Sequence, residues 1–228
     1  MLQVVYSPRW FFGVDAVIDV LSALVLISLM LATTRYYRIS GRRKHMLLAT
    51  AFGVIALGFV LNLFRNFIFY FSDSAAAPWI ISFSQLELST LFVTWMIVLA
   101  RVFTVTGLFM IYSLYYKNAS STNVLVVLLL IASMVLSAYA YFIFHLFSLL
   151  LLAFISAHFL QAYSRSGGRR RQLLAIGFSF IALSQLIFIF AGLNPWFYVA
   201  GEITQLVGYA SLLIMFLMVR YYGKKIAA

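Results

Sequence analysis

A single arginine stands inside a long apolar run, in the stretch VTWMIVLARVFTVTGLFM. A charge within a membrane span is costly, so such a residue indicates a functional site unless another group neutralises it. Arg101 therefore predicts a carboxylate partner, either Glu202 or Glu87. Two roles stay open for Arg101, a structural ion pair between helices or a part of a ligand or ion site.

A polar stripe runs along the last apolar segment. Glu202, Gln205 and Tyr209 recur at helical spacing and share one helix face, and Gln185 lies midway along the preceding segment. The sequence therefore predicts an outward-facing ligand or ion pocket, lined by Arg101, Gln185, Glu202 and Gln205. The alternative is that these groups only hydrogen-bond neighbouring helices, which is a common use of polar residues in membranes.

A second polar group is expected near the outer ends of the first three apolar segments. Asp15 and Asp19 are four residues apart and share a helix face. Together with Arg65 and Glu87 they predict an outer polar cluster. The alternative interpretation is a set of interfacial side chains that reach water.

Sequence patterns of the common enzyme classes are missing. The chain has no cysteine and contains neither GxSxG nor HExxH. Its three histidines are His45 in a basic loop, His145 in an expected outer turn, and His158 in a later helix. They do not form the pairs at matched depth that a haem would need. We therefore expect a protein that is not an enzyme and that holds no metal and no cofactor.

The elements that must position these groups are membrane helices. The chain is 65% hydrophobic and only 9% charged, whereas soluble domains carry about a quarter charged residues. Each apolar run has at least the length of about 20 residues that crosses a bilayer. Seven helices are predicted, with a turn near residues 141–145, at 10–37, 44–71, 86–116, 122–141, 144–164, 171–192 and 196–222.

The basic residues predict the orientation. Thirteen of the 16 Lys and Arg residues fall in four clusters, at 35–44, 117, 165–171 and 220–225. Seven spans put all four clusters on one side, which is the cytoplasmic side by the positive-inside rule. We expect the N-terminus outside and the C-terminus inside, in the cytoplasmic (plasma) membrane.

Two of the basic clusters form short loops, whose charged residues are Arg42, Arg43 and Lys44, and Arg169, Arg170 and Arg171. Such loops satisfy the topology and face anionic headgroups, so the net charge of +11 needs no nucleic acid. The lipid bilayer is the expected partner. A protein partner at these loops and a homo-oligomer remain open.

An internal repeat explains the order of the helices. Residues 37–60 and 163–186 are identical at eleven of 24 aligned positions. We predict a single domain over 1–228, with repeat one at 10–117, a linker helix at 122–141 and repeat two at 144–225. An odd linker makes the two three-helix units parallel, in a 3+1+3 arrangement. Counted back from the shared Tyr-Tyr ends, Arg101 would lie at the depth of Val207.

This 3+1+3 plan is similar to that of the SWEET sugar transporters and the wider PQ-loop family, including the KDEL receptors. The family marks the first helix of each repeat with a Pro-Gln pair. The first helices here, 10–37 and 144–164, contain no proline. The resemblance therefore concerns the architecture and carries over no functional residue.

Three functions fit these patterns. A small-molecule carrier would rock its two halves about the polar pocket, and a sensor or receptor would bind a ligand there and contact a partner through its basic loops. We favour a ligand-binding bundle of one of these two kinds. The alternative is a structural or accessory subunit of a larger membrane complex.

Overall fold

The computed structural model describes residues 8–11, 13–73, 87–116 and 141–226. Its elements are the 3-10 turn η1 (Arg9–Phe11) and the helices α1 (Val14–Ser40), α2 (Arg43–Asp73), α4 (Glu87–Tyr115), α6 (Tyr141–Ser166), α7 (Arg169–Ile189) and α8 (Pro195–Ile226). Within these residues, six helices are long and apolar enough to cross a membrane. The protein is thus an all-helical membrane bundle in the part that the structure describes.

Six of the seven predicted spans match these helices, with ends that agree within four residues. The remaining span, 122–141, lies almost wholly outside the described residues. The predicted turn at 141–145 is wrong, because α6 begins at Tyr141 and continues through His145. No glycine or proline interrupts residues 123–163, so the sequence offers no signal for the start of this helix.

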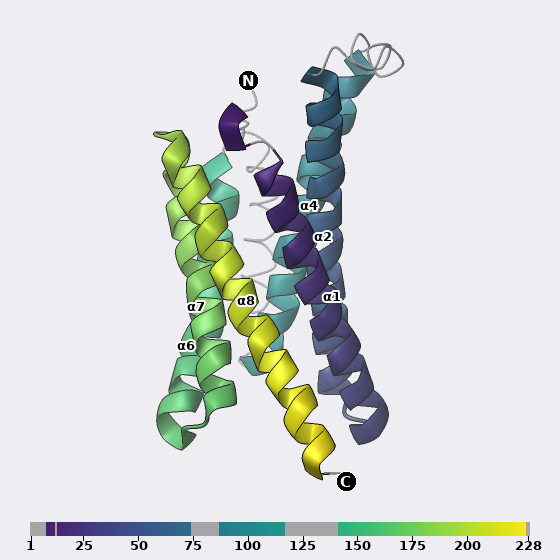
Figure 1. The fold of residues 1–228 in the computed structure, drawn as a ribbon, viewed down its shortest axis with the longest axis vertical. Helices are drawn as coiled ribbons and strands as arrows, with labels where there is room; N and C mark the ends of the chain where they lie inside the picture. The colour runs from purple at the N-terminus through teal and green to yellow at the C-terminus, as the bar shows by residue number, and fades with distance from the viewer. Residues whose placement is uncertain (1–7, 12, 74–86, 117–140, 227–228) are drawn as a thin grey trace.

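The helices pack as two sets of three (Figure 1). In one set α2 packs against α1 and α4, and in the other α7 packs against α6 and α8. Smaller contacts between α1 and α8 and between α4 and α6 join the sets. The α1–α2 and α6–α7 turns lie at the same end of the bundle as the C-terminus, and we call this end the basic end.

Glycines close the two turns at the basic end. Gly41 has a φ of 64° and donates its N–H to the Tyr37 carbonyl at 2.8 Å. Gly167 has a φ of 61° and donates to the Tyr163 carbonyl at 2.7 Å. A positive φ costs glycine little, so both helices end in the same kind of cap.

Glycines also let the helices within each set approach closely. A side chain on Gly107 of α4 would meet Ile55 and would lie 2.8 Å from the Ala51 carbonyl of α2. One on Gly208 of α8 would lie 2.6 Å from Ile181 and 2.9 Å from the Gly177 carbonyl of α7. Small residues at such crossings allow the backbone contacts that hold membrane helices together.

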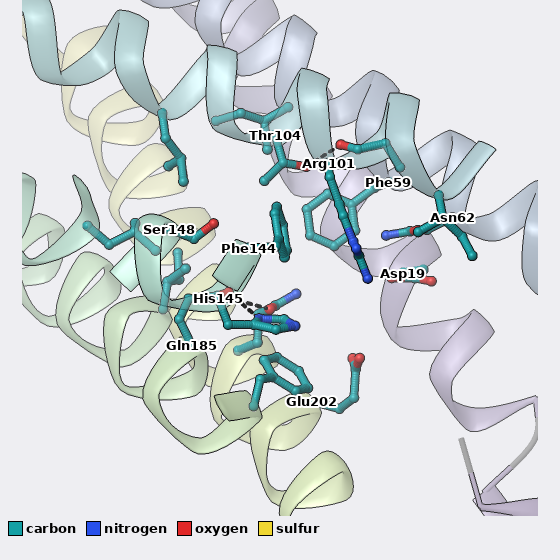
Figure 2. Close-up of a pocket in the computed structure, with 18 of the residues that line it drawn as sticks. Asp19, Phe59, Asn62, Arg101, Thr104, Phe144, His145, Ser148, Gln185 and Glu202 are labelled. Atoms are coloured by element: carbon teal, nitrogen blue, oxygen red, sulfur yellow. Dashed lines mark hydrogen bonds between the residues drawn. The ribbon is translucent and has the colours of Figure 1, made fainter. Parts of the chain in front are cut away.

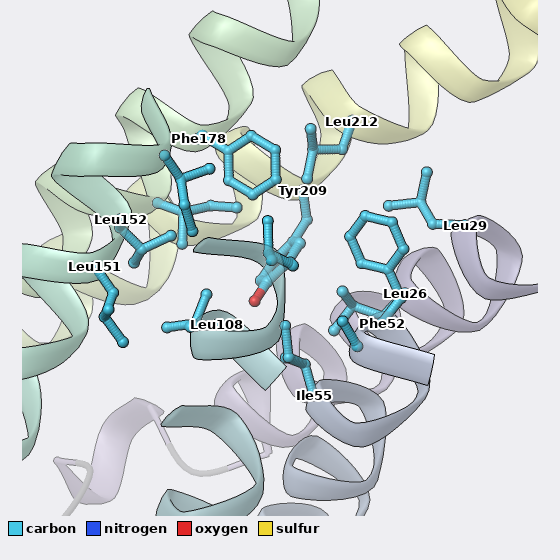
Figure 3. Close-up of a cluster of buried hydrophobic side chains, with 14 of the residues drawn as sticks. Leu26, Leu29, Phe52, Ile55, Leu108, Leu151, Leu152, Phe178, Tyr209 and Leu212 are labelled. Carbon is cyan, nitrogen blue, oxygen red and sulfur yellow. The ribbon is translucent and has the colours of Figure 1, made fainter. Parts of the chain in front are cut away.

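The centre of the bundle is a cluster of buried apolar side chains from all six helices, which we call the apolar cluster (Figure 3). Its most deeply buried large residues are Leu26, Ile111, Leu152, Ile155 and Leu212. Along α1, Leu26 of this cluster lies between Asp19, nearer the start of the helix, and Thr33, nearer the basic end. The cluster therefore separates the polar side chains described next from the basic end.

Candidate functional site

A polar cavity of about 110 Å³ lies among the helices (Figure 2). Its lining residues Asp19 and Tyr198 lie near the starts of α1 and α8, away from the basic end. Every one of the six helices contributes to its wall. Its polar lining consists of Asp19, Asn62, Arg65, Arg101, Thr104, Tyr141, His145, Ser148, Gln185, Tyr198, Glu202, Gln205 and Tyr209. The four predicted pocket residues, Arg101, Gln185, Glu202 and Gln205, therefore all line one cavity.

Gln185 links three helices by hydrogen bonds. Its Oε1 lies 2.8 Å from His145 Nδ1, and its Nε2 donates to Gln205 Oε1 at 3.3 Å. An amide oxygen can only accept, so His145 Nδ1 carries the proton in this arrangement. The amide of Gln185 is thus fixed between α6 and α8 and cannot rotate freely toward a ligand.

The sequence analysis left several lining residues out of the predicted pocket, among them Tyr141, Ser148 and Tyr198, and it misplaced His145. His145 was expected in an outer turn, whereas the structure buries it in α6, with its ring centroid 4.4 Å from that of Tyr141 and 5.0 Å from that of Phe188. The spacing of His145, Ser148 and Leu152 places all three on one face of a helix, provided that the helix begins before residue 144. This spacing is the sequence signal that could have assigned His145 to the pocket.

Arg101 enters the cavity from α4. Its guanidinium carbon lies 5.5 Å from the Phe144 ring centroid and 5.7 Å from that of Tyr141. A guanidinium over an aromatic face gains cation–π attraction, and this gain is larger where water is excluded. The aromatic rings of α6 therefore hold the arginine side chain at the wall of the cavity.

Glu202 enters from α8 and points into the same space from the opposite side (Figure 2). Its side chain is 8% exposed, and its Oε2 has no hydrogen-bond partner among the described residues. The expected Arg101–Glu202 ion pair is therefore not made through this oxygen. Ser148 Oγ, also buried and lining the cavity, likewise has no partner within the described chain.

The predicted outer cluster is brought together in part. Asn66 bridges two of its members, because Nδ2 donates to Asp19 Oδ2 at 3.0 Å while Oδ1 accepts from Arg65 Nη2 at 2.8 Å. Asp15 is separate from this bridge, since its Oδ1 accepts the N–H groups of Gly13 and Ala16 at the start of α1. The Glu87 side chain lies outside the described residues.

The predicted contact residues at the basic end are exposed where the structure describes them, namely Arg42, Arg43, Lys44, Arg169 and Arg171. The side chain of Arg170 is outside the described part. Arg171 Nη1 donates to the Ala162 carbonyl at 3.4 Å, near the end of α6. Charged ends of this kind are free to meet headgroups or a protein surface.

A second cavity, of about 140 Å³, lies between the apolar cluster and the basic end. Its wall is almost wholly apolar and includes Thr33, Tyr36, Phe52, Phe159 and Met215. Within the described residues, the apolar cluster thus lies between this cavity and the polar one.

The described residues contain no group of three or more His, Asp or Glu side chains that could hold a metal ion. No protein-family model, curated protein or solved structure matches the chain. The site must therefore be interpreted from its own geometry, and the architectural resemblance to SWEET and PQ-loop proteins gains no support from sequence or structure comparison.

Proposed function

We propose that this protein is a membrane carrier for a small polar solute, and that it is not an enzyme. The observation that carries this proposal is the polar cavity walled by all six described helices, with Arg101 and Glu202 directed into it from opposite sides. Polar and charged groups are expensive within a membrane span and are retained there for a purpose. A solute site at mid-bundle is such a purpose.

The carrier would be built from two parallel three-helix repeats joined by a linker helix, giving seven spans. A shift of 126 residues supports this arrangement in the first two helices of each repeat. With this shift the residues of the Tyr37–Gly41 cap, which ends α1, correspond to those of the Tyr163–Gly167 cap, which ends α6. The same shift also takes the buried face of α1 onto that of α6, since Ser22 and Leu26 become Ser148 and Leu152, and all four are buried.

The third helices of the repeats support the same plan with a shift of 101 residues. Gly107 packs against Ala51 and Ile55, and Gly208 packs against their counterparts Gly177 and Ile181. This register makes Arg101 the counterpart of Glu202. It differs from the register of the shared Tyr-Tyr ends, which would place Arg101 beside Val207, and the close glycine contacts are the stronger guide.

With this pairing, the polar cavity lies where the two repeats face each other. Carriers built from parallel repeats bind their substrate at the repeat interface and expose it by rocking one half against the other. The apolar cluster would then be the closed gate on the basic side. Opening it would connect the polar cavity with the second cavity and the basic end.

The proposed orientation places the basic end in the cytoplasm of a cell whose plasma membrane holds the protein, with the N-terminus outside. Because the chain has no cysteine, single-cysteine variants can test this directly. We expect Arg42→Cys and Arg169→Cys to react with an impermeant maleimide only after the cells are opened. Leu193→Cys, in the exposed turn before α8, should react in intact cells, and the reverse pattern would overturn the orientation.

Transport is tested by counterflow in proteoliposomes. Vesicles preloaded with unlabelled glycine, acetate, ethylamine and glycerol are given each compound in radiolabelled form, and protein-free vesicles are the control. Accumulation of any one label above the control supports a carrier. Saturable binding to the purified protein without accumulation would instead favour a sensor that signals through its basic turns. If neither is seen and other membrane proteins co-purify in fixed ratio, the chain is a structural subunit.

A further inference from the structure

Acidic and basic side chains are equal in number around the polar cavity. Its described wall contains two carboxylates, Asp19 and Glu202, and two guanidinium groups, Arg65 and Arg101. A ligand with net charge would add an uncompensated charge to a region of low dielectric, where such a charge is costly. The cavity therefore favours a ligand that is neutral overall.

Two of these four side chains, Asp19 and Arg65, are already linked to each other within the protein. Asn66 hydrogen-bonds to Asp19 on one side and to Arg65 on the other. The groups directed at the cavity centre are Arg101 and Glu202, which come from α4 and α8 and face each other across the space (Figure 2). A ligand between them would meet a cation at one end and a carboxylate at the other.

Glu202 provides the strongest indication of a ligand group. A buried acceptor without a partner is costly, and native structures seldom leave one without a reason. Glu202 Oε2 is such an acceptor, and Ser148 Oγ is a second unpartnered group in the same wall. A ligand with several N–H donors, such as a primary ammonium group, would satisfy the carboxylate oxygen with a charge-assisted hydrogen bond.

Arg101 provides the complementary end. A guanidinium has five N–H donors in a planar fork that matches a carboxylate, so it can bind one in addition to its other contacts. Phe144 and Tyr141 support the plane of this group. The size of the cavity, about 110 Å³, is well below that of pockets for drug-sized ligands.

From these observations we propose that the cavity binds a short zwitterionic amino acid, with its ammonium group on Glu202 and its carboxylate on Arg101. This inference rests on the proposed solute-binding function and names its substrate class. It requires both charges in one small molecule. An amine alone would make no use of the Arg101 fork, and a carboxylate alone or a neutral polyol would place no cation on Glu202.

The test uses the same proteoliposomes with glycine, β-alanine and trimethylglycine as probes. Trimethylglycine keeps both charges but has no N–H donor, so it should not accumulate, whereas glycine or β-alanine should. Glu202→Gln should lower the uptake of the accepted amino acid by about 10- to 100-fold, the factor that follows from losing a charge-assisted hydrogen bond. Arg101→Lys keeps the charge but loses the fork, so it should lower uptake by a smaller factor.

Thr204→Val is the matched control on α8, because the Thr204 hydroxyl donates to the Ala200 carbonyl of its own helix at 2.7 Å and Thr204 does not line the cavity as the described residues form it. It should leave uptake unchanged. Size-exclusion profiles of all variants show whether they fold, and calorimetric binding of glycine to the purified wild-type and Glu202→Gln proteins gives a readout that does not depend on transport.

The outcomes separate the two proposals. Glycine binding without uptake supports the zwitterion site and overturns the carrier. Uptake of glycerol, acetate or ethylamine without any amino acid supports the carrier and overturns the zwitterion site. Unchanged uptake and binding of glycine by a folded Glu202→Gln protein also overturns the zwitterion site. Neither uptake nor binding of any probe overturns both.

Discussion

The polar cavity and the apolar cluster are neighbouring regions built by the same six helices. In the cluster, residues paired by the proposed repeat are alike, as Leu26 and Leu152 are. In the cavity they differ, and Arg101 is paired with Glu202. Packing needs similar side chains on both sides of a pseudo-two-fold axis. A ligand with two different ends needs different ones, so the proposed repeat would keep its symmetry where the protein holds together and would lose it where a ligand binds.

This contrast assigns different consequences to substitutions in the two regions. The side chains of the apolar cluster are buried against one another, so truncation there should cost stability. The cavity contains polar groups that are only partly satisfied by the protein, so substitution there should cost little stability and should instead change ligand binding. The predictions below test this division, beginning with the largest expected loss of stability.

Leu212→Ala should strongly destabilise the bundle. Leu212 is 1% exposed and packs against Gly177 at the α7–α8 crossing. Removing a buried leucine side chain leaves a cavity and costs about 2–5 kcal/mol. The free energy of unfolding can be measured by titration with a denaturing detergent. Leu217→Ala is the control, since Leu217 is 50% exposed on the same helix and should change little. Equal losses for both variants would contradict a packed apolar cluster.

Gly208→Ala and Gly107→Ala should cost about 1–3 kcal/mol each, the usual range for overpacking a tight contact. The added methyl group would meet Ile181 at Gly208 and Ile55 at Gly107. Because the two glycines make matching contacts, their losses should also be similar. Gly192→Ala is the control, since nothing lies within 4 Å of the added atom. A loss at only one of the two glycines would argue against the repeat register.

The six described helices could be predicted from the sequence because the length of a span is set by the bilayer and not by tertiary contacts. The start of α6 could not. Residues 123–163 are almost continuously apolar and have no glycine or proline to mark a boundary. The sequence therefore predicted a turn across residues that form the first part of α6, and His145 was not included in the predicted pocket.

The four predicted pocket residues were chosen because polar side chains in apolar helices are rare, and the structure places all four along one cavity. Their relation to one another could not be predicted, because it depends on which helix faces meet. The sequence suggested an ion pair of Arg101 with Glu202 or Glu87. In the structure Arg101 lies over the rings of α6 and Glu202 Oε2 accepts no hydrogen bond from the described chain, while the Glu87 side chain lies outside the described residues. The glycine contacts at the helix crossings, which the sequence does not reveal, favour a different repeat register from the one that the shared Tyr-Tyr ends predict.

Gln185→Leu tests the polar network of the cavity. It removes the hydrogen bonds to His145 and Gln205 and leaves two buried polar groups without their partner. Hydrogen bonds between membrane helices are worth about 1 kcal/mol or less, so we expect a loss of that size in the same unfolding titration. Gln172→Leu, at an exposed position of α7, should cost less. A loss as large as that of Leu212→Ala would mean that the cavity, too, serves mainly to hold the helices together.

Ser148→Ala should have the smallest effect on stability. Its hydroxyl is buried and has no hydrogen-bond partner among the described residues, so removing it leaves no other group unsatisfied and should change the free energy of unfolding by less than about 0.5 kcal/mol or increase it. Ser184→Ala is the matched control, because Ser184 is also buried but donates to the Ile181 carbonyl at 2.7 Å. If Ser148 serves a bound solute, its variant should weaken ligand binding while Ser184→Ala does not. A clear loss of stability in Ser148→Ala without a change in binding would show that this hydroxyl serves packing. Ser148 would then belong with the apolar cluster and not with the ligand-binding part of the cavity around Glu202.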